Sequence, residues 1–209
     1  MKVLETETDL TRTRLVDAAA AVFSERGFDK AGVQEIARRA GLTTGAIYSR
    51  FTGKAQLLHA ALEAHCADEL DDLFNQHGFS GHAADIFVIA GEHLVEPDPD
   101  EDDGGALLLE AFVAARRDPE VRQIVRTVLE ERADRLREVV EAAKLDGTVD
   151  ESVDSESIVR FAHAVGLGFL LYEAVEIDLP APGPWAQLIT RLVASVAPSA
   201  SSTETHKGD

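Results

Sequence analysis

Residues 33–51 read VQEIARRAGLTTGAIYSRF, and this stretch predicts two short helices joined by a tight bend. The first helix fits residues 33–40, because apolar side chains recur there at intervals of three and four. The second fits residues 44–50, with Thr43 as its N-cap. Gly41 lies between them and suits the left-handed backbone that commonly ends a helix. The pattern predicts a helix-turn-helix, a motif that can place its second helix in a DNA groove.

The second helix of this pair is expected to turn Ile47 inward and to present small, hydroxyl and aromatic groups outward. Such groups suit the base edges and phosphates of a major groove. The same pattern also fits a tight corner between two helices of any helical protein, so that alternative stays open. The outward-facing residues are Thr43, Thr44, Gly45, Tyr48 and Ser49.

Charge is distributed unevenly along the chain, whose formal net charge is −18 over 209 residues. Positions 10–54 hold eight basic and four acidic residues, whereas the chain from position 55 onward holds 11 basic and 31 acidic residues. A uniformly acidic body would repel duplex DNA. The basic segment around the helix-turn-helix therefore favours a nucleic-acid site weakly, with chance clustering as the alternative.

Helical spacing continues through the rest of the sequence and predicts an all-α protein of about nine helices. Strand-like alternation is absent from the sequence. The acidic segment EPDPDEDDGG at 96–105 predicts a solvated loop, and residues 198–209 predict a disordered tail. The other expected helices are one ending near Gly27, one from position 53 or 54 to beyond 70, and those over 82–95, 106–117, 121–144, 155–175 and 185–196.

Residues 11–64 resemble the DNA-binding domain of the tetracycline-repressor (TetR) family of bacterial transcriptional regulators. The resemblance is carried by AAVFSERGF at the end of the first helix, by VQEIARRAGLTTGAIYSRF, and by the Gly-Lys pair at 53–54. It implies a three-helix DNA-binding domain at 10–53 and a larger helical domain for effector binding and dimerisation at 54–197. The expected function is that of a dimeric repressor, released from a palindromic operator by a small molecule.

The resemblance also implies roles for single residues. Thr43 would cap the recognition helix and touch phosphate, Thr44 and Gly45 would approach bases, Tyr48 would pack on the DNA backbone, and Lys54 would bind phosphate. Thr44 stands where the family often has lysine, and Ser49 with Arg50 stands where paired histidines are common, so the operator sequence is left open. The side chains themselves add Arg38 and Arg50 as phosphate contacts and Gln34 and Ser49 as possible base contacts.

The acidic body is expected to form a homodimer through residues 157–175 and 185–196, as the family does. The first of these segments is apolar around most of its circumference, although a central core helix of a monomer would look similar. Glu110 in ALLLEAFVAA could attract a cationic ligand or be a paired structural glutamate. The residues expected to line an effector pocket are Leu62, Phe74, Phe87, Leu109, Glu110, Phe112 and Phe169, each of which also suits an ordinary core.

No motif in the sequence calls for a metal or another cofactor. His59, His65 and Cys66 lack the spacing of a zinc site, and no nucleophile elbow or phosphate loop is present. A helical enzyme with a hidden carboxylate pair and a helical adaptor that binds protein are the rival functions. The single cysteine, the polar N-terminus and the lack of an apolar run of roughly 18 residues predict a cytoplasmic protein without a membrane partner.

Overall fold

The computed structural model describes residues 2–66, 83–95 and 104–198. Within these ranges the chain forms helices and no strand, so the predicted all-α class is confirmed. None of the described helices is both long and apolar enough to cross a membrane. The helices are α1 (Lys2–Lys30), α2 (Val33–Arg39), α3 (Thr44–Tyr48), α4 (Lys54–His65), α6 (Ala83–His93), α7 (Gly105–Ala115), α8 (Pro119–Leu145), α9 (Ser155–Glu173) and α10 (Pro182–Ser195).

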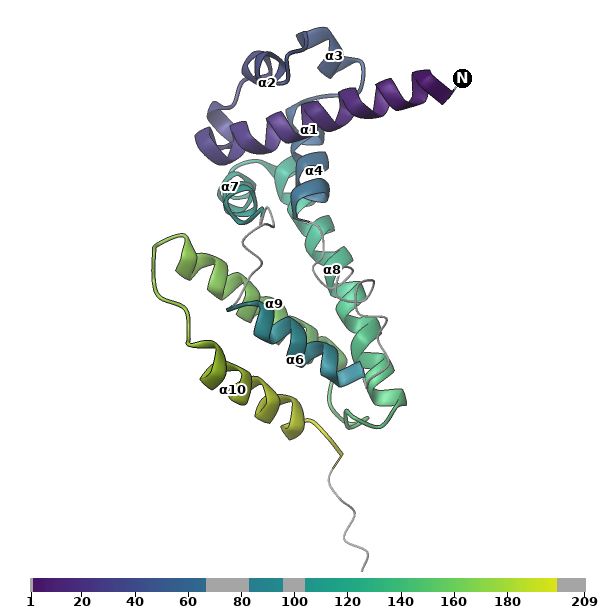
Figure 1. Ribbon diagram of the computed structural model, residues 1–209, viewed down its shortest axis with the longest axis vertical. Coiled ribbons are helices and arrows are strands. Elements are labelled where there is room, and N and C mark those ends of the chain that lie inside the picture. Colours follow the sequence, from purple (N-terminus) through teal and green to yellow (C-terminus); the bar gives the residue numbers. More distant parts are fainter. Residues whose placement is uncertain (1, 67–82, 96–103, 199–209) are drawn as a thin grey trace, which may run out of the picture.

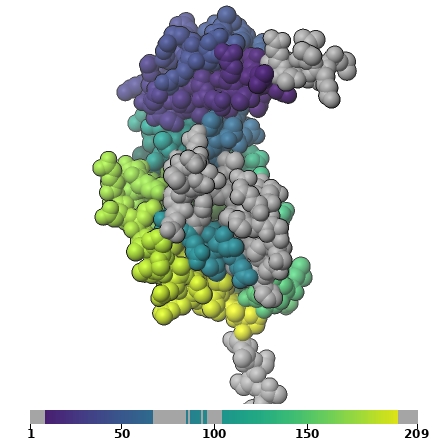
Figure 2. All heavy atoms as spheres, in the orientation of Figure 1, coloured from purple at the N-terminus to yellow at the C-terminus, as the bar shows by residue number. Residues whose placement is uncertain are grey.

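The molecule is elongated, with a head of α1, α2 and α3 at one end (Figure 1). Helix α4 leads from the head into the body, where the long α8 runs along one side. Helix α9 packs mainly against α8, and α10 packs mainly against α6. Figure 2 shows the head as a separate lobe above the body. The arrangement holds α2 and α3 at the far end of the molecule, away from α9 and α10.

The head is held together by one apolar cluster that continues into the body. Phe23 of α1, Ile36 of α2 and Ile47 of α3 are fully buried in this cluster, as are Leu57 and Leu62 of α4. Each such side chain contributes about 1.5–3 kcal/mol when it leaves water. Because the same cluster includes residues of α7 and α8, the head is packed on the body rather than tethered to it.

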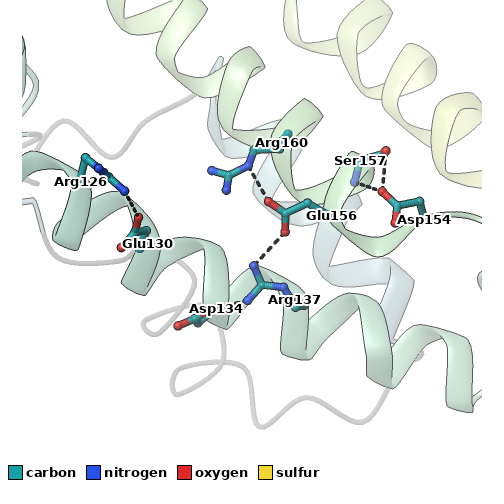
Figure 3. Close-up of polar contacts among 8 residues, drawn as sticks. All are labelled: Arg126, Glu130, Asp134, Arg137, Asp154, Glu156, Ser157 and Arg160. Atoms are coloured by element: carbon teal, nitrogen blue, oxygen red, sulfur yellow. Dashed lines mark hydrogen bonds and ion pairs between the residues drawn. The ribbon is translucent and has the colours of Figure 1, made fainter.

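The start of α9 is fastened to α8 by an ion network at the protein surface (Figure 3). Glu156 lies 2.9 Å from Nη2 of Arg137 on α8 and 2.6 Å from Nε of Arg160 on α9. The hydrogen bond from Arg137 lowers the pKa of the Glu156 carboxyl. One residue before α9, Asp154 accepts 2.8 Å and 2.7 Å hydrogen bonds from the backbone N–H and the hydroxyl of Ser157. The network therefore sets where α9 begins and how it lies on α8.

Several helix boundaries differ from those predicted. Helix α1 begins at Lys2, is broken at Gly27, and continues for one more turn to Lys30. Helix α3 ends at Tyr48 rather than at position 50, and α10 begins at Pro182, because a proline fits the first turn of a helix. The predicted continuation of the fourth helix past position 66, most of the acidic loop at 96–105 and nearly all of the predicted tail lie outside the described residues.

Candidate functional site

The bend between α2 and α3 is set by the backbone conformation of Gly41, and hydrogen bonds satisfy the carbonyl groups at the end of α2. Gly41 has a φ of 66°, a left-handed conformation that favours glycine. The N–H of Leu42 then donates to the carbonyl of Ala37 at 2.9 Å, and Arg14 of α1 donates to the carbonyl of Ala40 at 2.6 Å. The end of α2 is thereby satisfied, and the chain is redirected into α3.

Helix α3 begins as the sequence predicted. Thr43 has an extended backbone, and its Oγ1 accepts a 3.3 Å hydrogen bond from the N–H of Ala46. Ile47 is fully buried against the head, whereas the Tyr48 side chain is 60% exposed. The expectation that this helix turns Ile47 inward and Tyr48 outward is therefore met by the structure.

The remaining predicted contacts on α3 lie along one accessible edge of the head. Thr43, Gly45 and Ser49 are exposed, and Thr44 is half-buried at the first position of the helix. The Ser49 hydroxyl donates to the carbonyl of Ala46 at 3.0 Å, so one of its hydrogen-bonding directions is already used. The edge combines a phenol, three hydroxyls and a glycine without an acidic group, a composition suited to an anionic and hydrogen-bonding partner.

Arg50 does not extend from the head. Its Nη1 donates to the carbonyl of Ala46 at 3.3 Å and to Oγ of Ser49 at 3.0 Å. The guanidinium therefore folds back over the last turn of α3. This conformation stabilises the short helix, and a contact with a partner molecule would require the side chain to turn outward.

The basic residues of α2 are paired with glutamates of the head. Glu35 accepts hydrogen bonds of 3.1 Å and 2.8 Å from Arg38 and lies 3.3 Å from Arg26 of α1. The hydrogen bond from Arg38 lowers the pKa of the Glu35 carboxyl. Arg39 pairs with Glu25 at 2.7 Å. Arg38 and its neighbour Gln34 are nevertheless exposed, so both are accessible on the same side of the head.

Lys54 makes a contact that the sequence did not indicate. Its Nζ donates to the carbonyl of Phe28 at 2.6 Å and lies 3.4 Å from the carbonyl of Asp29. The same ammonium is 4.2 Å from the centroid of the Phe28 ring, within the range of a cation–π interaction. Lys54 thus holds the end of α1 against the start of α4, in addition to any contact with phosphate.

A cavity of about 570 Å³ lies in the body and is lined by residues of α6 to α10 and by Cys66 at the end of α4. Its lining is mainly apolar and includes two of the residues predicted for an effector pocket, Phe87 and Phe169. The Phe169 ring meets Trp185 edge to face, with centroids 4.9 Å apart. Arg132, His163 and Glu173 are among the polar residues of the lining. Sequence reasoning missed these three, although Arg132 precedes the buried Leu136 by one helical turn.

The other residues proposed for the effector pocket lie elsewhere. Leu62 is fully buried in the cluster between head and body, and Phe112 packs on that same cluster one turn beyond the cavity-lining Leu108. Leu109 is half-buried and is not part of the lining, and Phe74 lies outside the described residues. Position along an apolar helix did not distinguish the face toward the cavity from the face toward the core.

Glu110 also lies away from the cavity, in a hollow between the end of α1 and α7. Its Oε2 is 2.9 Å from the place that a Cβ on Gly27 would occupy. Gly27 has a φ of 76° and a ψ of 156°, a conformation that is essentially restricted to glycine. Next to it, Arg117, two residues after the end of α7, pairs with Asp29 at 3.5 Å. Glu110 therefore belongs to the junction between head and body, because it lies about 200° around α7 from Leu108.

Comparison with known proteins agrees with this division of the molecule. The family described as "Bacterial regulatory proteins, tetR family" matches residues 15–61, and the one described as "Tetracyclin repressor-like, C-terminal domain" matches residues 98–196. The chain belongs to the TetR family of DNA-binding transcriptional regulators. Members of this family bind DNA and small-molecule ligands and act as dimers.

Individual relatives are similar over different parts of the chain. The transcriptional regulator SrpR of Pseudomonas putida is 46% identical over 56 residues, which cover 27% of this chain and 26% of SrpR. UidR of Escherichia coli is 25% identical over 169 residues, which cover 79% of this chain and 84% of UidR. The solved structure of FadR from Bacillus subtilis in complex with stearoyl-CoA superposes with a TM-score of 0.69 at 17% identity, covering 89% of this chain and 99% of FadR. That last likeness concerns the fold alone.

Proposed function

We propose that this protein represses transcription by binding a roughly palindromic operator as a homodimer. The observation that carries the proposal is α3, a capped helix whose Tyr48, Thr43 and Ser49 are exposed at the far end of the head. Thr44, Ser49 and Gln34 would read base edges, while Tyr48, Arg38 and backbone N–H groups would contact phosphates. Because one head covers only a few base pairs, two heads and two half-sites are required for specificity.

The proposed dimer face is a stripe of residues along α9, spaced alternately four and three positions apart. This α9 stripe contains no charged residue, although the chain carries a net charge of −18, so two copies approach there with the least repulsion. A Cβ atom placed on Gly168 would meet no other atom within 4 Å, so there is room at this position for a side chain of the partner. Leu188 and Leu192 add exposed apolar area on α10. The α9 stripe consists of Ser157, Phe161, Ala164, Gly168 and Leu171, and the exposed Val175 follows in the turn after α9.

The effector of this proposal is a small, mainly apolar molecule held in the cavity between α6 and α10. Its volume of about 570 Å³ is within the usual range for ligand sites. The similar fold of FadR is known in complex with stearoyl-CoA, a molecule with a long apolar tail. Release from DNA would require the effector to bind one arrangement of the two heads better than the other, since only differential affinity shifts an equilibrium.

Helix α7 offers a direct route from the cavity to the head. Gly105 and Leu108 near its beginning line the cavity, whereas Glu110 lies beside Gly27 of α1 and Arg117, just past the end of α7, pairs with Asp29. A small rotation of α7 around an effector would move both groups of contacts together. We place the boundary between DNA-binding domain and body at 53–54 as part of this proposal, with α4 as a second connection because it packs on both α1 and α8.

To test this function, DNA fragments that the protein binds are selected from a pool of random duplexes. The affinity of the protein for the selected site is then measured by fluorescence anisotropy at several salt concentrations. We expect a selected site with two related half-sites and an affinity that falls steeply with salt. Tyr48→Ala should weaken binding about tenfold, or 1.4 kcal/mol, without changing the circular dichroism spectrum. Leu145→Ala, at an exposed position far from α3, is the matched control and should bind as the wild type does.

Two results would contradict this function. Binding that does not depend on salt, or a Tyr48→Ala variant with wild-type affinity, would exclude α3 as the DNA-binding helix. Selected sites without a repeated half-site would exclude the dimeric arrangement while leaving DNA binding intact.

A further inference from the structure

The cavity in the body carries its positive and its negative charge at different depths. Arg132, from the middle of α8, lines the cavity together with Leu136, which follows one turn further along the helix. Leu136 is buried and Arg132 is half-buried, so this side of α8 faces away from bulk water. Glu173, the acidic residue of the lining, is exposed at the last position of α9. The positive charge therefore lies deeper than the negative one.

The guanidinium of Arg132 has hydrogen-bonding capacity that the chain does not use. Its Nη2 donates to the carbonyl of Cys66 at the end of α4. A guanidinium carries its N–H donors in a planar fork, so the remaining donors are left for another acceptor. Within the described part of the chain, no carboxylate pairs with Arg132. Arg126 and Arg137 on the same helix differ in this respect, since each pairs with a glutamate (Figure 3).

A half-buried cation beside apolar side chains selects ligands by their charge. Removing a charged group from water is costly unless an opposite charge or hydrogen bonds compensate for it. An organic cation would be repelled by Arg132 and would meet Glu173 only at the exposed rim, where water and salt screen the attraction. An uncharged ligand would fill the cavity and leave the guanidinium without a counter-charge. A carboxylate instead accepts two parallel N–H groups of an arginine, a pairing that is both strong and geometrically specific.

We propose that the effector is an organic anion with an apolar body, whose acidic group pairs with Arg132. This assignment rests on the effector cavity of the proposed function and adds the chemical class of the ligand. The apolar body would lie against the aromatic and aliphatic lining, which includes Phe87 and Phe169. The acidic group would lie beside Cys66, whose thiol donates to the carbonyl of Gly104 at 3.4 Å. It would therefore lie where α4 ends and α7 begins, and both of these helices pack on α1.

The test compares decanoate, decanol and decylamine, which share one alkyl chain and carry a negative, a neutral and a positive head group at neutral pH. Equilibrium dialysis gives each dissociation constant without the need for a spectroscopic signal. Arg132→Met removes the charge and keeps an unbranched side chain, and Arg132→Gln also keeps a donor for the carbonyl of Cys66. Arg126→Met makes the same change at an exposed position of α8 that does not line the cavity, and it serves as the matched control.

We expect the wild type and Arg126→Met to bind decanoate at least about tenfold more tightly than decanol, because a charge-assisted pair forms only with the acid. Decylamine should bind these two proteins most weakly. In both Arg132 variants the preference for decanoate should disappear or reverse, since an apolar cavity binds an uncharged alcohol better than an anion that must leave water. Decanol should bind all four proteins with similar affinity, which would show that the cavity is intact in the variants.

The other outcomes separate the anionic class of the effector from the proposed function. A wild type that binds decanol or decylamine as tightly as decanoate would overturn the anionic class, even if the Arg132 variants failed to fold, and would leave an apolar effector in place. Arg132 variants that bind decanol normally and still prefer decanoate would also overturn it, since another group would then hold the anion. A wild type that binds none of the three ligands would contradict the effector cavity of the proposed function, and the anionic class with it.

Discussion

Replacing Lys54 by methionine tests whether this residue supports the head or only contacts DNA. Lys54 donates a 2.6 Å hydrogen bond to the carbonyl of Phe28, and its ammonium lies over the Phe28 ring. Hydrogen bonds of charged groups contribute about 1.5–3 kcal/mol, and a cation–π contact at a partly exposed position about 0.5–1 kcal/mol. Water can reach the freed carbonyl in the variant, so we expect a loss of about 2 kcal/mol.

Urea unfolding followed by circular dichroism measures this loss directly. In a chain of 209 residues, a loss of about 2 kcal/mol corresponds to a fall in Tm of roughly 4–8 °C. Lys30→Met is the matched control, because Lys30 is an exposed lysine at the end of α1 and its removal changes the net charge equally. We expect the control to unfold with nearly the wild-type free energy.

The salt dependence of DNA binding then separates the two roles of Lys54. A lost phosphate contact lowers the slope of log Kd against log salt concentration by roughly 0.9, whereas a purely structural lysine leaves the slope unchanged. A Lys54→Met variant that unfolds within about 0.5 kcal/mol of the wild type would refute the structural role argued above, whatever the slope.

Three further changes test other parts of the structure. Gly27→Ala should lower the free energy of unfolding by about 2 kcal/mol, because alanine is strained at a φ of 76° and its Cβ meets Glu110; an unchanged urea midpoint would contradict this conformation. Thr43→Val should cost about 1 kcal/mol through loss of the N-cap of α3 and should weaken DNA binding, and anisotropy equal to that of the wild type would contradict it. Hydrogen bonds from Ser157 lower the pKa of Asp154 below its ordinary value of 3.8, so its contribution to stability is present above that pH and is lost as the pH falls through the lower folded-state pKa. Asp154→Asn keeps a capping group without the charge, so its unfolding free energy should fall less steeply below pH 4 than that of the wild type, and equal slopes would argue against the shift.

The local sequence was sufficient to predict the recognition helix, because each feature that determines this helix acts over only a few residues. The cap at Thr43, the positive φ at Gly41 and the inward position of Ile47 depend on neighbours within one or two helical turns. Such preferences are present in the chain before it folds, so a reader of the sequence can recover them. The outward position of Tyr48 follows from Ile47, because adjacent residues of a helix point about 100° apart.

Contacts between distant segments could not be obtained in this way. Lys54 contacts Phe28 across 26 positions of the chain, and Glu110 lies beside Gly27 across a still longer separation. From the sequence alone, each side chain suits a different role: Lys54 suits a contact with phosphate, and Glu110 suits a contact with a ligand. Their packing partners become known only when α1, α4 and α7 are placed together.

The sequence by itself determined the helical class, the position of the helix-turn-helix and the family to which the chain belongs, because helix periodicity, caps and glycine conformations are local properties. Tertiary structure decided which apolar residues line the cavity and which only fill the core. Phe87 and Phe169 reach the cavity while Leu62 and Phe112 do not, although all four are apolar residues in helices. An apolar side chain is buried equally well in a filled core or beside an empty volume, so burial alone carries no information about the difference. That difference arises from how α6, α8, α9 and α10 are held apart, which depends on contacts along the whole length of the body.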